Sequence, residues 1–90
     1  MLAWVRGRRS EQRRKDSAIR RAVQEFRERR GFAPMGGHVL HQGPQELIVR
    51  VMYLTDHIPP DRVWFAVSET DTTVREISFN DVAHLEAPWR

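Results

Sequence analysis

The sequence predicts an α+β protein in which one N-terminal amphipathic helix packs on a small antiparallel sheet of about four strands. Two observations support this prediction. Apolar residues recur at helical spacing before Gly31, and beyond Gly37 they recur at every second position, as in strands. The chain has 90 residues, enough for one domain, and we expect residues 17–90 to form it. A helix attached to a small SH3-like barrel is the alternative.

The helix is predicted from an apolar stripe with spacing i, i+3, i+4 and i+7. Its end is marked by Gly31, which can adopt the left-handed conformation that terminates helices, and by Pro34, which prevents the helix from resuming. Ser10 can act as the N-cap. The pattern therefore predicts a helix over residues 17–30, with a start near Ser10. The stripe consists of Ile19, Ala22, Val23 and Phe26.

Residues 1–16 form a basic arm, in which residues 1–9 have no periodic pattern and residues 10–16 lack an apolar face. The arm is either a solvated extension of the helix or disordered until it binds a partner. Within the helix, the spacing i, i+4 predicts the ion pairs Asp16–Arg20 and Glu25–Arg29.

Four segments of alternating apolar residues, separated by Gly, Pro, Asp and Thr, predict the sheet. The second is apolar on both faces apart from Arg50, so we expect it to be central and covered on both sides. Trp64 is expected in the core. The predicted strands are His38–Gln42, Glu46–Leu54, Arg62–Ser68 and Thr73–Phe79.

After the last strand, Asn80 or Asp81 can cap a single helical turn. A final strand at Ala83–Glu86 would suit the barrel. We favour the open sheet, because the apolar stripe of the helix needs a surface to cover.

Positive charge is concentrated at the N-terminus. Eleven of the 15 Lys and Arg residues lie in the first 31 positions with four acids, whereas the remaining residues hold four Arg and eight acids. This asymmetry predicts a basic helix that meets an anion. The absence of cysteine excludes disulfides, and no apolar run is long enough to span a membrane, so we expect a cytoplasmic protein.

Five arginines are the candidate contacts with an anion. Three of them recur every seven residues and so share one helical face, and the other two lie beside them. One hypothesis is binding to nucleic acid. Another is an adaptor role in which the helix meets an acidic protein surface, with Trp4 and Trp89 as candidate anchors. The five arginines are Arg13, Arg14, Arg20, Arg21 and Arg27.

The adaptor hypothesis includes a homodimer, in which the basic helix meets acids of a second copy. The acids available for this contact lie in the C-terminal half of the chain. They are Glu69, Asp71, Glu76, Asp81 and Glu86.

The sequence holds no sign of catalysis. His38 and His41 are three apart in a strand, so they are expected on opposite faces, and no thiolate is present to complete a zinc site. The loop Asp56–Asp61 contains an Asp–His pair without a nearby nucleophile, and phosphate-loop and nucleophile-elbow patterns are missing. We therefore predict a non-enzymatic binding domain without cofactor, metal or small-molecule substrate.

Overall fold

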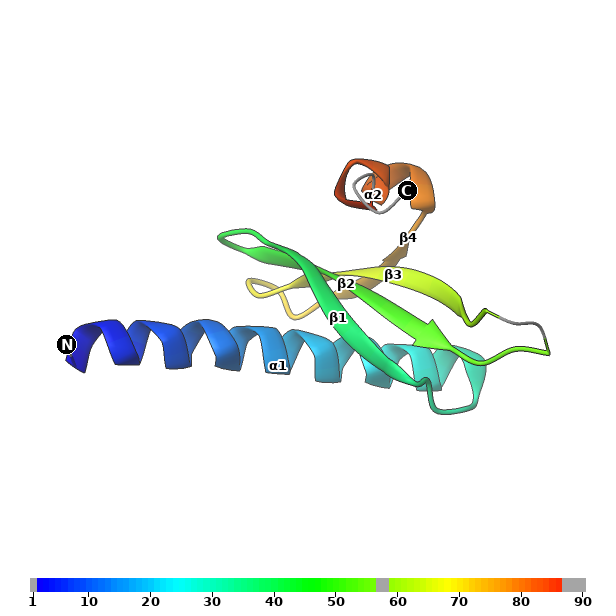
Figure 1. Ribbon diagram of the computed structural model, residues 1–90, viewed down its shortest axis with the longest axis horizontal. Coiled ribbons are helices and arrows are strands. Elements are labelled where there is room, and N and C mark those ends of the chain that lie inside the picture. Colours follow the sequence, from blue (N-terminus) through cyan, green and yellow to red (C-terminus); the bar gives the residue numbers. More distant parts are fainter. Residues whose placement is uncertain (1, 57–58, 87–90) are drawn as a thin grey trace.

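A computed structural model describes the backbone of residues 2–56 and 59–86, and within these ranges the side chains from Ser10 onward. One long helix lies under a sheet whose far side carries a short helix (Figure 1). The α+β class and the helix-on-sheet arrangement predicted from the sequence are confirmed. The elements are α1 (Leu2–Arg30), β1 (Gly36–Gln42), β2 (Glu46–Tyr53), β3 (Asp61–Ser68), β4 (Val74–Ile77) and α2 (Phe79–Glu86).

The four strands form one antiparallel meander in the order β1-β2-β3-β4. β1 and β4 are the two edges of this sheet, so it is open rather than closed into a barrel. Residues 83–86, a strand in the barrel alternative, lie in α2. The open sheet is therefore the correct one of the two architectures.

The start of α1 differs from the prediction. The helix begins at Leu2 rather than near Ser10, so the basic arm and the domain share one continuous helix. The arginines, glutamate, glutamine and lysine around Ser10 favour helix, which outweighs the cap signal of the serine. The end is as predicted: Gly31 has φ of 82°, and its N–H donates to the carbonyl of Arg27 at 2.8 Å.

The core lies between α1 and one face of the sheet. Ala18, Ala22 and Phe26 are buried, whereas Ile19 and Val23 from the predicted stripe are only half-buried. The small alanine side chains let α1 approach the sheet closely. The sheet contributes Leu47, Val49, Val51, Val63, Phe65 and Val67.

The second face of the sheet is partly covered by α2. β3 is the strand buried on both sides, since all its residues from Val63 to Val67 are buried, and Trp64 lies in the core as predicted. β2 is central in the sheet, but only one of its faces is fully buried, which corrects the prediction for that strand. Phe79 packs on Trp64 with ring centroids 5.6 Å apart.

Phe79 was predicted in the last strand and instead begins α2. Ser78, not Asn80 or Asp81, is the N-cap: the carboxylate of Asp81 accepts hydrogen bonds from the Ser78 backbone N–H at 3.2 Å and from its hydroxyl at 3.1 Å. This cap follows directly after β4, which ends at Ile77, two residues before Phe79.

Candidate nucleic-acid interface

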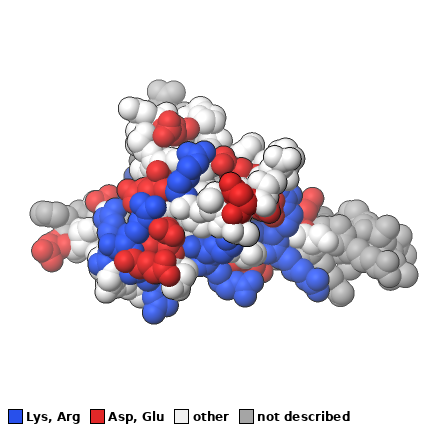
Figure 2. Space-filling view, turned by 180° about the vertical axis from the view of Figure 1, so that it is seen from behind, with Lys and Arg blue, Asp and Glu red and all other residues white. Residues whose placement is uncertain are grey.

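A row of three arginines runs along the face of α1 that points away from the sheet. Arg13, Arg20 and Arg27 are all exposed, and the seven-residue spacing places successive members about 10.5 Å apart along the axis, or about 21 Å in total. We call these residues the arginine row. Figure 2 shows Lys and Arg side chains along the lower edge of the molecule, which α1 forms, with acidic side chains between and above them.

The members of the arginine row pair with no acid among the described residues. The predicted i, i+4 pair Asp16–Arg20 does not form, and the Asp16 carboxylate instead accepts a hydrogen bond from the side-chain amide of Gln12 at 2.9 Å. The other predicted pair does form, with Arg29 and Glu25 2.6 Å apart. Hydrogen bonding to Glu25 raises the pKa of Arg29 above its usual value.

Arg14 was predicted to contact the partner, and the structure uses it to hold α1 to the sheet. Its guanidinium donates to both carboxylate oxygens of Glu69 at 3.0 Å and to the carbonyl of Gly43 at 2.7 Å. The hydrogen bond between the two side chains raises the pKa of Arg14 and lowers that of Glu69. One side chain therefore ties the helix to the β1–β2 and β3–β4 turns.

Arg21 is likewise turned toward the sheet. It is half-buried and donates to the carbonyl of Ser68 at 2.9 Å, and its second terminal nitrogen is buried without a hydrogen-bond partner. Of the five predicted contact residues, the structure therefore leaves three exposed to solvent and turns Arg14 and Arg21 into internal contacts.

Two further arginines at the end of α1 are also engaged. Arg29 and Arg30 lie 4.0 and 3.7 Å from the Glu76 carboxylate on β4. Arg30 also stacks over the rings of Phe26 and Tyr53 at 5.6 and 5.5 Å. Glu76 is distant from both arginines in the chain, so the sequence pattern predicted the pair of Arg29 with Glu25 but not these contacts with Glu76.

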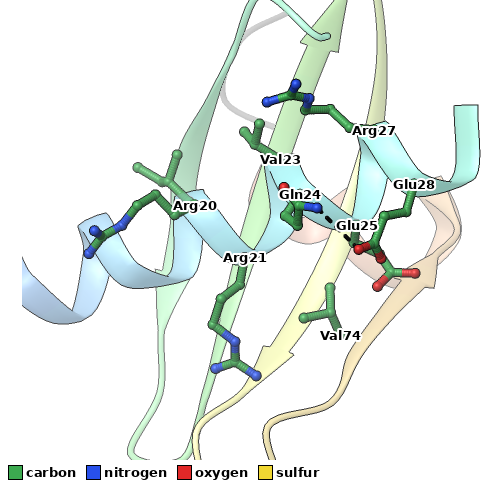
Figure 3. A pocket seen from close by; sticks show the side chains of 9 residues that line it. Arg20, Arg21, Val23, Gln24, Glu25, Arg27, Glu28 and Val74 are labelled. Carbon is green, nitrogen blue, oxygen red and sulfur yellow. Dashed lines mark hydrogen bonds between the residues drawn. The ribbon is translucent and has the colours of Figure 1, made fainter. Parts of the chain in front are cut away.

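An open hollow of about 540 Å³ lies along the outer surface of α1. Figure 3 shows that Arg20, Arg21 and Arg27 diverge around it rather than pointing to one centre, while Gln24 donates to Glu28 at 3.1 Å. Diverging cations cannot surround one small anion. The arrangement suits an extended ligand whose charges are spread over a similar length.

Two of the described histidines, His38 and His41, lie on β1. A β-bulge between Val39 and His41 shifts the register, so that His38 and His41 pair with Arg50 and Ile48 on the same face of β2. The prediction of opposite faces is therefore wrong. Among the described residues, no cluster of three or more His, Asp or Glu could hold a metal ion.

The remaining predicted features fall partly outside the described residues. Trp89 and His57 lie there, and so does the side chain of Trp4, whose backbone is helical. No helix in the described part of the chain has the length and apolar character needed to cross a membrane.

In comparisons with known proteins, no family model, no curated protein and no solved structure matches the chain.

Proposed function

We propose that this protein binds nucleic acid through the outer face of α1, with Arg13, Arg20 and Arg27 as phosphate contacts. The proposal is supported by the exposure and the lack of pairing of these three side chains. They lie on one helical face and form no ion pair with an acid in the described structure. The other arginines of α1 from Arg14 onward are held by internal acceptors. The anions for the row must therefore come from a partner or from solution.

Arginine chemistry favours phosphate as that anion. The guanidinium is always charged and forms paired hydrogen bonds with phosphate oxygens. A polymer of phosphates can reach all members of a row about 21 Å long, which a small anion cannot do. Binding of this kind releases condensed counterions and so weakens as salt is raised.

Self-association through opposite charges has less support, because three of the five acids it would use already pair with arginines. Glu69 binds Arg14, and Glu76 lies against Arg29 and Arg30. Glu86 pairs with Arg50, whereas Asp71 and Asp81 accept hydrogen bonds from Thr73 and Ser78. An acidic surface on another protein remains the alternative partner.

The proposal predicts that removing two row members weakens binding far more than removing two paired arginines. Each phosphate contact contributes about 15-fold to affinity at about 50 mM salt relative to 1 M, so R20Q/R27Q should bind about 200-fold more weakly. Fluorescence anisotropy with labelled duplex DNA, single-stranded DNA and RNA measures this change.

The matched control is R29Q/R75Q, which has the same net charge but loses arginines that pair with Glu25 and Glu46. It should keep an affinity close to that of the unmodified protein. Absence of binding to every nucleic acid at low salt would refute the proposal, as would an equal loss in both variants.

A further inference from the structure

We infer that the nucleic acid recognised by the arginine row is double-stranded and is contacted through its phosphates rather than its bases. This inference rests on the proposed function and specifies its ligand. Three observations support it: the convex shape of the surface, its lack of exposed aromatic rings between Ser10 and Arg30, and the rigid spacing of its charges.

The surface is convex. α1 forms an outer layer beneath the sheet (Figure 1). The exposure and the seven-residue spacing of Arg13, Arg20 and Arg27 put the arginine row on the side of this helix that faces away from the sheet. The hollow along it is open, with diverging arginines around it. Proteins that hold single strands track the backbone in a positively charged groove. A straight, convex row can instead lie against the surface of a duplex without wrapping it.

Aromatic stacking is missing along the row. From Ser10 to Arg30, every exposed side chain is polar, and the one aromatic, Phe26, is fully buried. Single strands are held by bases that stack on successive aromatic rings, each worth about 1–3 kcal/mol. This surface therefore lacks the main source of affinity for a single strand.

Among the described side chains, Phe32 is the one exposed aromatic ring near the row. It is 46% exposed, lines a hollow of about 350 Å³ with Arg27, and packs edge-on against Phe26 at 5.3 Å. It lies beyond the end of α1, so it offers a platform for at most one base. The effect of Phe32 on affinity therefore distinguishes a single strand from a duplex, because only a single strand has an unpaired base that can stack on this ring.

The spacing of the charges also favours a duplex. A helix holds the arginines at fixed intervals, and a duplex is stiff over about 150 base pairs. Neither the protein nor the duplex therefore has to lose much conformational freedom on binding. A duplex releases about 0.9 counterion per contact against about 0.7 for a single strand. For three contacts at about 0.1 M salt, this difference alone favours the duplex by about fourfold.

The test compares duplexes of about 20 base pairs with their own single strands, as DNA and as RNA, at about 0.1 M salt. We expect each duplex to bind at least about fourfold more tightly than its strands, a duplex of scrambled sequence to bind equally well, and R13Q/R20Q/R27Q to lose duplex affinity. F32L should leave duplex affinity unchanged.

Equal or tighter binding of single strands, with weakening by F32L, would overturn the inference while the proposed function stands. A strong preference for one duplex sequence would also overturn it, because phosphates carry no sequence information. Failure of every duplex and strand to bind would refute the proposed function itself.

Discussion

Glu86 is a buried carboxylate placed between two arginines on the second face of the sheet. Its side chain is 2% exposed, and its oxygens lie 3.2 Å from Arg50 on β2 and 3.3 Å from Arg62 on β3. A charge removed from water in this way is tolerated only because opposite charges surround it. These contacts join the last turn of α2 to the two central strands.

We predict that E86Q lowers the free energy of unfolding by about 2 kcal/mol, somewhat less than for a fully buried pair because both arginines are partly exposed. In a domain of this size the thermal midpoint should fall by about 8–16 °C. Differential scanning calorimetry measures the shift. E28Q is the control, since Glu28 is exposed on α1, and its effect should stay within about 0.5 kcal/mol. Equal midpoints for E86Q and the unmodified protein would show that the buried pair contributes nothing.

The arginines show how far single residues can be predicted from a sequence. The seven-residue spacing identified the shared face of Arg13, Arg20 and Arg27, and these remain exposed. Arg14 and Arg21 differ from their neighbours by one position, or about 100° around the helix. That rotation brings them to acceptors 55 and 47 residues away, which no local pattern reveals.

The position of α1 on the sheet depends on its small side chains. Ala18 and Ala22 are buried where the helix crosses the strands, and Gly37 on β1 leaves room for Ile19, whose methyl carbon would lie 3.1 Å from an added Cβ. The helix can thus approach closely enough for Phe26 to be fully buried. This close packing holds the arginine row in place relative to the rest of the molecule.

We predict that A22L destabilises the fold by about 1–3 kcal/mol, because Ala22 is completely buried and a larger side chain must push α1 from the sheet. Q24L places the same leucine on the exposed side of the same helix and should change stability by less than about 0.5 kcal/mol. Urea unfolding followed by circular dichroism compares the two. A similar midpoint for both variants would contradict the close packing described for α1.

Helices and strands with a clear periodicity of apolar residues could be predicted from the sequence, but some of the residues at which they begin and end could not. Alternation in β2 and β3 reflects one face packed on α1, so the strands and their order followed from the sequence. Phe79 continued the alternation of Ile77, and the hydrogen bonds between Ser78 and Asp81 start the helix at Phe79 instead. The start of α1 was missed because a polar helix has no apolar period to detect.

At the scale of the whole molecule, the fold separates cations that are paired with acids from cations that are exposed and, within the described structure, unpaired. Most cations of the sheet and of the end of α1 are paired with acids, whereas the outer face of α1 keeps unpaired arginines among the described residues. A net charge of +3 conceals this separation. The sheet packs on one side of a basic helix, and the opposite side of this helix is not covered by other helices or strands of the described chain (Figure 1).

The salt dependence of duplex binding tests the central claim most directly. Log affinity is measured against log salt between about 50 and 200 mM for the unmodified protein, for R13Q/R20Q/R27Q and for R29Q/R30Q/R75Q, two variants of equal net charge. If the three row arginines each neutralise one phosphate, the slope for R13Q/R20Q/R27Q is shallower by about 2.7, and that for R29Q/R30Q/R75Q is almost unchanged. Equal slopes for the two variants would contradict the account, because binding would then depend on net charge and not on the arginine row.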